Sequence, residues 1–182
     1  MEVALESAGV VVVPVAELKA YLRITTVDQD AVLGALIDAA AGQCERFTGQ
    51  PPVVRDAQDI VPVGTKWTRL ALAPVRAITA VMGIPAEGSE FALPAGAYAI
   101  DIDARGEGWI RIDSPGAAGR VRVSYSAGIA QEMGATPPEL RAGILRLAAE
   151  DYLTREAGRT MRAGLPPTVT ALWRPWRRMR LA

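Results

Sequence analysis

Residues 136–159 read TPPELRAGILRLAAEDYLTREAGR and predict one long helix against which other parts of the chain pack. Thr136 can cap its start, Pro137 suits the first helical position, and Glu139 can complete a capping box. Gly158 suits the left-handed position that ends a helix. At ~1.5 Å per residue the helix would be about 30 Å long.

Apolar residues lie on more than one side of this helix. One side is formed by Leu140, Ile144, Leu147 and Ala148. A second strip continues toward the opposite side and is formed by Leu145, Ala149, Tyr152 and Leu153. A helix with so few polar positions needs contacts on more than one side.

A charge pair, Asp151 and Arg155, lies within the first apolar side in the favourable i,i+4 order. We therefore predict a contact between subunits on this side, formed by Leu140, Ile144, Leu147, Asp151 and Arg155. A salt bridge inside one domain is the alternative that the sequence leaves open.

The chain has 182 residues, enough for one domain or a domain with an insert. Half of the residues are hydrophobic, which is typical of a globular protein. Residues 1–156 hold all 20 acidic and 14 of the 20 basic residues, a net charge of −6. Residues 157–182 carry the remaining six arginines and no acid, which indicates that this tail binds something.

The chain has one cysteine and no histidine, so it has neither a disulfide framework nor histidine ligands for a metal. Glu2 and Glu6 stand where a signal peptide would be basic, and the first apolar run is too short for a membrane span. We therefore expect synthesis in the cytosol, and neither a metal nor a cofactor.

Two helices are predicted before the middle of the chain. Pro14 can start the first, which reaches Leu22. Asp28 can cap the second, which runs to Thr48 and stops at Gly49. Between residues 53 and 128 the pattern changes to short alternating segments separated by turns, which predicts a small antiparallel sandwich or barrel.

The sequence thus predicts an α+β protein in four parts. Residues 1–52 form an N-terminal helical part, and 53–128 form an antiparallel β insert. Residues 129–159 supply the long helix that completes the helical core, and 160–182 form an extended, basic C-terminal arm.

Candidate catalytic residues are few. Asp101 and Asp103 alternate on one strand, a spacing more typical of a solvated face than of two carboxylates across a cleft. Gly106 and Gly108 lack the spacing of a phosphate-binding loop and predict a hairpin turn. Cys44 falls on the apolar side of its helix and is predicted to be buried.

The tail carries the strongest local signal, because tryptophans alternate with arginines. Its candidate docking residues are Leu172, Trp173, Arg174, Trp176, Arg177, Arg178 and Arg180. Trp and Arg are favoured at protein interfaces, and they can also stack on bases and neutralise phosphates. Docking to a protein, an ordered clasp within the chain, nucleic-acid binding and disorder all remain open.

The order of segments along nearly the whole chain resembles one known family. The segments are LKAYLRI, DQDAVLGALIDAAAGQCERFTG, LAPVRAITAV, YAIDID, VRVSYSAGIA, PPELRAGILRLAAEDYLTRE and LPPTVTALWRPWRRMRL. They resemble the head–tail connector, or adaptor, proteins of long-tailed bacteriophages and phage-like gene transfer agents. The β insert is longer than in the smallest connectors.

The resemblance implies a non-enzymatic structural protein of the virion, located in the neck between head and tail after assembly in the bacterial cytoplasm. It implies a homo-oligomeric ring, typically dodecameric, below the portal protein. The ring would extend the DNA channel and present a surface to a stopper or tail-side protein. It also implies that the C-terminal arm reaches the portal. An acidic body suits a channel that passes DNA without holding it.

Two other functions follow from residues alone. The tail from Trp173 to Arg180 could make the chain a nucleic-acid-binding module. Asp101 and Asp103 could form the centre of an enzyme, although histidines, metal ligands and phosphate loops that would support one are missing.

Overall fold

The structure is a computed structural model that describes residues 2–4, 12–158 and 164–178. The chain divides into two compact units, each of which is described by itself. One unit comprises Met1–Ala8 and Val54–Ile129, and the other comprises Gly9–Val53 and Ala130–Ala182. The sequence placed the β insert at 53–128. The sequence assigned the N-terminal residues to the helical part instead. In the structure they belong to the β unit, because β1 (Glu2–Ala4) pairs with β2 (Arg55–Pro62).

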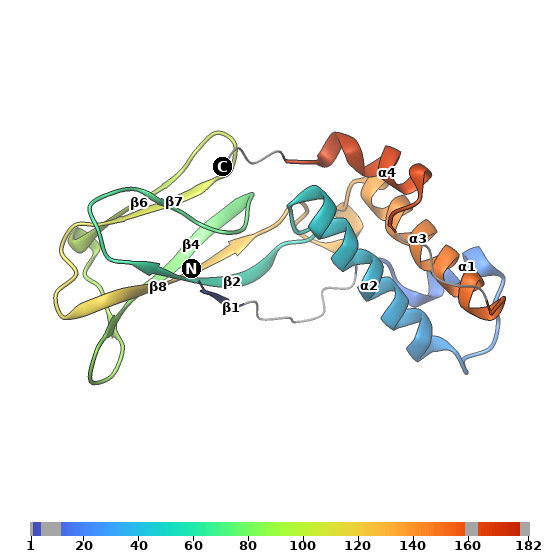
Figure 1. The fold of residues 1–182 in the computed structure, drawn as a ribbon, viewed down its shortest axis with the longest axis horizontal. Coiled ribbons are helices and arrows are strands. Elements are labelled where there is room, and N and C mark those ends of the chain that lie inside the picture. The colour runs from blue at the N-terminus through green and yellow to red at the C-terminus, as the bar shows by residue number, and fades with distance from the viewer. Residues whose placement is uncertain (1, 5–11, 159–163, 179–182) are drawn as a thin grey trace. The chain divides into compact units, whose positions relative to one another are not determined.

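The β unit consists of two antiparallel sheets. The five-stranded sheet has the order β1, β2, β8 (Ala118–Ala127), β4 (Val75–Pro85) and β5 (Phe91–Ala92). The three-stranded sheet has the order β3 (Thr68–Arg69), β7 (Gly108–Ile112) and β6 (Tyr98–Ile102), with the short 3₁₀ helix η1 (Ala95–Ala97) before β6. Figure 1 shows the strands of both sheets.

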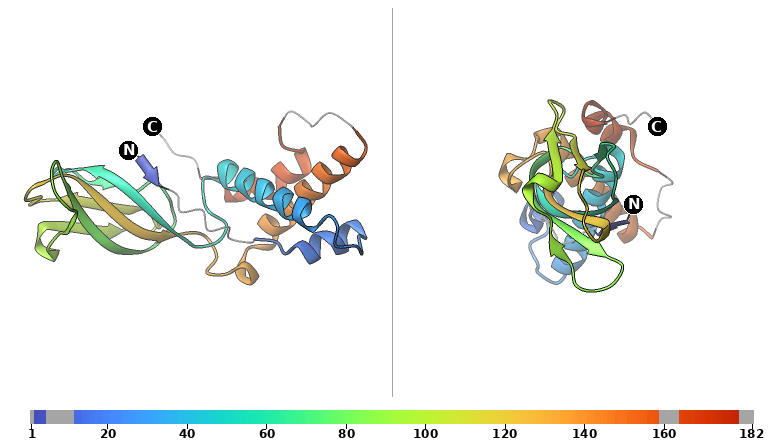
Figure 2. Two further views of the ribbon diagram at one scale, coloured as in Figure 1. Left: turned by 90° about the horizontal axis from the view of Figure 1, so that it is seen from below. Right: turned by 90° about the vertical axis from the view of Figure 1, so that its left-hand side faces the viewer.

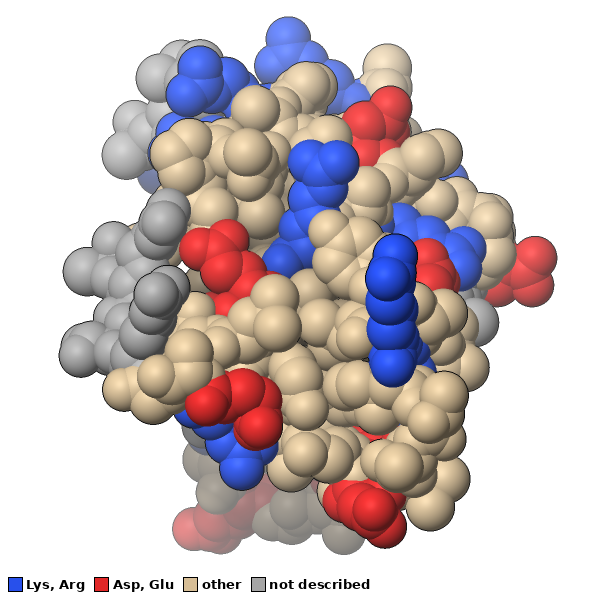
Figure 3. Space-filling view, turned by 90° about the vertical axis from the view of Figure 1, so that its right-hand side faces the viewer, with Lys and Arg blue, Asp and Glu red and all other residues tan. Residues whose placement is uncertain are grey.

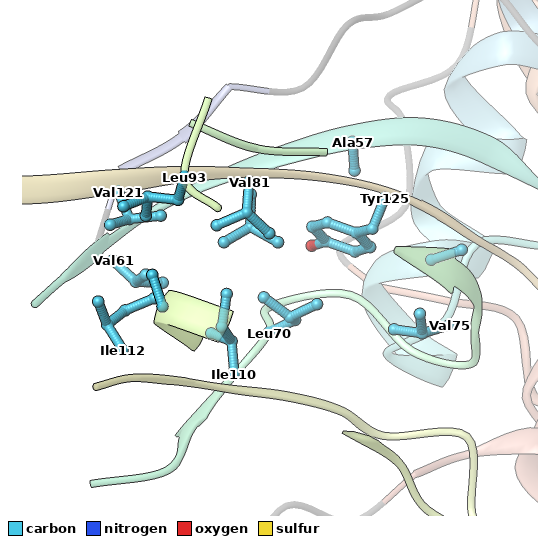
Figure 4. Packing of buried hydrophobic residues seen from close by; sticks show 13 residues of the cluster. Ala57, Val61, Leu70, Val75, Val81, Leu93, Ile110, Ile112, Val121 and Tyr125 are labelled. Carbon is cyan, nitrogen blue, oxygen red and sulfur yellow. The ribbon is translucent and has the colours of Figure 1, made fainter. Parts of the chain in front are cut away.

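The core of this unit lies between the two sheets. Ile110 and Ile112 of β7 point toward Val81, Val121 and Tyr125 of the larger sheet (Figure 4). The predicted alternation is confirmed on β8, where every second residue from Val121 to Ala127 is buried. On β4 the sequence predicts the same alternation for Val75, Ala77, Thr79 and Val81, and this prediction is wrong. Register shifts against β8 interrupt the phase, and Ala77 and Thr79 face solvent.

A buried polar cluster holds the segment after β3 against this core. The Ala71 amide donates to Asp59 Oδ2 at 2.6 Å, and the Tyr125 hydroxyl donates to Asp59 Oδ1 at 3.1 Å. The Leu72 amide donates to the Tyr125 hydroxyl at 3.1 Å. Burial raises the pKa of Asp59, an effect that its hydrogen bonds from Ala71 and Tyr125 oppose.

The helical unit contains α1 (Val15–Leu22), α2 (Asp30–Thr48), α3 (Pro138–Glu156) and α4 (Pro167–Trp173). Short 3₁₀ helices, η2 (Met133–Ala135) and η3 (Arg174–Trp176), precede α3 and follow α4. Figure 2 shows these helices from two further directions. Within the described residues no helix is long and apolar enough to cross a membrane.

The ends of the helices test the predicted start and stop signals. Gly49 and Gly158 both have positive φ, 71° and 61°, as expected for residues that end a helix. The predicted caps are wrong. α2 begins after Gln29 without a side-chain cap from Asp28, and Pro137 precedes α3 while the Thr136 hydroxyl is buried without a hydrogen bond. The adjacent prolines 137 and 138 shift the start of α3 by one residue from the expected position.

Candidate docking surface

The C-terminal segment is anchored by Trp173, which is fully buried in the helical unit. Its indole lies over Gly143, where a side chain would be only 2.7 Å from Trp173 Cε2. The indole Nε1 donates a hydrogen bond to the Leu140 carbonyl at 3.3 Å, and the ring lies 6.1 Å from that of Phe47. Gly143 therefore provides the slot that holds the tail against α3.

Two hydrogen bonds extend this attachment to the end of α2. The side-chain Nε2 of Gln50 donates to the Trp176 carbonyl at 2.6 Å. The Arg178 amide donates to the Thr48 carbonyl at 2.9 Å, so the chain past η3 runs against the residues that end α2. The ordered clasp within the chain, one of the alternatives left open by the sequence, is what the structure shows for Leu165–Arg178.

The outward side of this clasp defines the candidate docking surface, formed by Arg174, Trp176 and Arg177. Arg174 and Arg177 are exposed and Trp176 is half-buried. The Arg177 guanidinium lies 5.6 Å from the centroid of the Phe47 ring, a cation–π contact that holds its direction. The surface can offer two arginine charges and an indole to a partner without unfolding the clasp.

Other predicted docking residues have different positions. Trp173 is a core residue and cannot touch a partner while the helical unit keeps this packing, so its assignment as a docking residue is wrong. Leu172 and Arg178 are half-buried, and Arg180 lies outside the described residues. The extended arm expected for 160–182 is wrong for Leu165–Arg178, which pack into the helical unit.

The predicted subunit interface is also corrected in part. Leu140, Ile144 and Leu147 are almost completely buried within their own unit and form no surface. The large apolar residue that α3 leaves open is Leu153, with 57% of its surface exposed.

The charge pair predicted on α3 is not formed in the described part of the chain, where Asp151 makes no salt bridge with Arg155. Asp151 lines a small pocket together with Gln43, Leu147 and Glu150. Partial burial, with a smaller contribution from Glu150, raises the pKa of Asp151. A role for Asp151 and Arg155 between subunits stays a prediction.

The two candidate catalytic carboxylates lie in different environments. Asp103 caps the turn after β6, accepting hydrogen bonds from the amides of Arg105 at 2.8 Å and Glu107 at 2.9 Å. The hydrogen bond from the Glu107 amide is the main cause that lowers the pKa of Asp103. Asp101 is exposed on the strand. Gly106 has a φ of 72°, which confirms the predicted hairpin turn.

Metal and thiol chemistry find no support in the described residues. No group of three His, Cys, Asp or Glu side chains there could hold a metal ion. Cys44 is buried as predicted, and desolvation raises the pKa of its thiol to about 12, so it stays protonated and unreactive.

Charge on the end of the helical unit is mixed rather than uniform. Figure 3 shows Lys and Arg side chains at several separate places, with Asp and Glu between them. A protein that tracks a nucleic-acid backbone carries a continuous basic region. Among the described residues drawn in Figure 3, the basic side chains do not form one continuous region.

Sequence reasoning missed Gly143 and Phe47, which position the docking surface. A glycine inside a helix of large residues signals a close approach of another element. The sequence does not say which element approaches, because Gly143 and Trp173 are thirty positions apart.

The ordered C-terminal segment thus exposes Arg174 and Arg177 beside the half-buried Trp176, and Arg and Trp are residue types that protein interfaces favour. No protein-family profile matches the chain, and a comparison with curated proteins finds no match. Solved structures do match over its full length. They are described as the neck of an empty GTA particle computed with C6 symmetry, the neck of a native GTA particle computed with C12 symmetry, and the virion of a native gene transfer agent (GTA) particle.

These similarities cover 100% of this chain and 98% of each matched chain. Sequence identities are 26%, 26% and 27%, and the TM-scores are 0.80, 0.78 and 0.74. The resemblance to head–tail connector proteins of gene transfer agents, predicted from the order of segments, is confirmed.

Proposed function

We propose that this chain is a structural protein of the neck of a phage-like particle, where copies of it form a ring. The observation that carries the proposal is the full-length similarity to chains in gene transfer agent necks, in both sequence and fold. The C6 and C12 symmetries of those necks support a homo-oligomeric ring.

The finer role that we propose is that of a head–tail connector. The ring, a dodecamer in the particle, lies below the portal protein, extends the DNA channel and joins the head to a stopper or tail-side protein. Net negative charge over residues 1–156 supports passage of DNA without strong binding, since like charge repels phosphate.

Attachment to the portal is assigned in this proposal to the surface of Arg174, Trp176 and Arg177. The clasp fixes the backbone that carries these side chains, because the Trp173, Gln50 and Arg178 hydrogen bonds already order it. A surface that is ordered before binding loses less conformational entropy when a partner docks. The two exposed arginines suit a partner surface that carries carboxylates.

The first experiment asks whether the protein is in the neck. Purified particles are analysed by mass spectrometry, and particles from cells lacking the gene are imaged by electron microscopy. We expect the protein in complete particles, and DNA-filled heads separate from tails when it is missing. Normal tailed particles without the protein would contradict the proposal.

The second experiment tests the docking surface with charge reversal. Arg174→Glu and Arg177→Glu are compared with Arg120→Glu, an exposed position on β8 in the other unit. We expect the first two to weaken binding to the cognate portal protein in a pull-down, and Arg120→Glu to leave it unchanged. Equal binding by all three variants would remove this surface from portal attachment.

The alternative function, a nucleic-acid-binding module, rests on the arginines of the same C-terminal segment. It predicts affinity for DNA that falls steeply with salt and is lost when Arg174 and Arg177 are replaced. Absence of binding at low salt would exclude it.

A further inference from the structure

Strand β6 (Tyr98–Ile102) is an unpaired sheet edge in the described part of the chain, and it is longer than the other edge strands of the β unit. It forms one side of the order β3, β7, β6, and no other strand in the described residues pairs with its outer side. The other edge strands of the two sheets, β1, β3 and β5, have only two or three residues each, whereas β6 has five. Its register with β7 runs without a bulge from Tyr98 to Ile102.

The usual protections of an edge strand are missing from β6. Its sequence, Tyr-Ala-Ile-Asp-Ile, contains no lysine and no proline, and its one charged residue is Asp101. Edge strands of soluble proteins are normally short, bulged, charged, or covered by another element. Because β6 has one charge and no bulge, a covering element is the protection that remains.

Two apolar side chains on the core-facing side of β6 are exposed to solvent. Ile100 lies opposite Ile110 in the register and therefore on the same sheet face, yet Ile110 is 1% exposed and Ile100 is 46% exposed. Ile102, two residues further and on the same face, is 40% exposed. Ile100 and Ile102 thus share one face of the strand, and the structure leaves that face partly open to solvent at the edge of the sheet.

We propose that the β6 edge, with Ile100 and Ile102, is covered by a second copy of this chain, so that it is a lateral contact of the ring. This inference rests on the proposed neck ring. In a cyclic ring the neighbour on each side of a copy is another copy of the same chain. An apolar edge with few charges can be buried permanently in such an assembly, with backbone hydrogen bonds and isoleucine contacts contributing together.

Symmetry restricts how the contact is made. Pairing of β6 with β6 of the neighbour would need a twofold axis between them, and this closes a dimer rather than a ring. A cyclic ring requires that β6 of one copy meets a different surface of the next. We therefore expect a head-to-tail contact with a different segment of the neighbouring copy.

The test places a photo-crosslinking amino acid at position 100 and at position 87. Both are exposed, and Glu87 lies in the turn after β4. Purified particles that contain the variant chain are irradiated, and the products are separated by mass. For position 100 we expect a product of two chains of 19.3 kDa each as the major crosslink, with little of it for position 87. Peptide mapping should place the second attachment outside residues 98–102.

Each other outcome overturns the inference. A product with a different protein would make β6 an axial contact, and crosslinking only within one chain would mean that the edge is covered internally. A crosslink between two β6 strands would exclude the head-to-tail contact. If particles contain the protein but position 100 gives no product, the inference fails while the proposed function stands. If particles lack the protein, both fail.

A second variant tests the same edge without a crosslinker. Ile100→Asp should abolish incorporation into tailed particles, while Ile100→Thr retains it. Because position 100 is exposed in the single chain, both variants should have the same Tm as the unmodified protein. Normal incorporation of Ile100→Asp would contradict the proposal.

Discussion

Gly143→Ala should destabilise the helical unit, although the same exchange usually strengthens a helix. Alanine is favoured over glycine in a helix interior by about 1 kcal/mol. At Gly143 the new methyl group would lie 2.7 Å from Trp173 Cε2 and 2.8 Å from Trp173 Cδ1, too close for either atom to remain. Trp173 is fully buried, so the indole has to leave its slot or α4 has to move.

The size of the effect follows from what the indole loses. Removing a buried Trp or Phe side chain from a core costs about 3–5 kcal/mol, and overpacking without expulsion costs about 1–3 kcal/mol. After subtracting the gain in helix propensity, we expect a net loss of about 2–4 kcal/mol if Trp173 is expelled. For a chain of this length each kcal/mol corresponds to roughly 2–4 °C in Tm.

The assay is thermal and urea unfolding followed by circular dichroism at the helical minimum, because four tryptophans complicate a fluorescence signal. Gly34→Ala on α2 is the matched control, since its methyl group would meet Val15 Cγ2 at an ordinary 3.8 Å. Gly34→Ala should be neutral or stabilising. If Gly143→Ala is as stable as Gly34→Ala, the close packing of Trp173 on α3 is refuted.

Three further predictions concern the β unit. Tyr125→Phe removes the acceptor of the Leu72 amide and the donor to Asp59, so we expect a loss of about 1–3 kcal/mol in urea unfolding; unchanged stability would show that water replaces the hydroxyl. Because burial raises the pKa of Asp59, the folded state holds that proton more tightly, and stability should fall as pH rises from the ordinary range near 4 through the raised pKa. Asp59→Asn cannot ionise and should lose this fall, whereas an identical pH profile would count against the assignment. Asp103→Ala should speed amide hydrogen exchange at Arg105 and Glu107, which donate to its carboxylate, and equal exchange rates would contradict the turn-capping role.

The candidate docking surface was predictable in composition but not in form. Alternating Trp and Arg near the C-terminus marked a segment in which Arg174 and Arg177 are exposed and Trp176 is half-buried, and its role in docking stays a prediction. The same signal cannot separate a tryptophan that faces a partner from one that anchors the segment. For Trp173 the deciding fact is a slot over Gly143, which exists only after α3 and α4 have packed.

Burial on α3 shows the same division. The i,i+3,i+4 pattern correctly gathers Leu140, Ile144 and Leu147 on one side. Whether that side meets its own chain or another copy is not encoded in the pattern, because both contacts bury the same apolar area. The helical unit of the single chain already covers it, while Leu153 remains exposed.

The sequence by itself determined the α+β class, the extent of the β region, the buried cysteine and the glycine-terminated helices, because periodicity and turn chemistry are local properties. The order of segments also determined the resemblance to neck proteins. Only the tertiary structure decided that the tail is a clasp, that β1 joins the β unit and that Ile100 is left open. Each of these depends on which distant segments come into contact. Hydrophobic burial stabilises such contacts in proportion to the apolar area buried, whatever the separation of the segments in the chain.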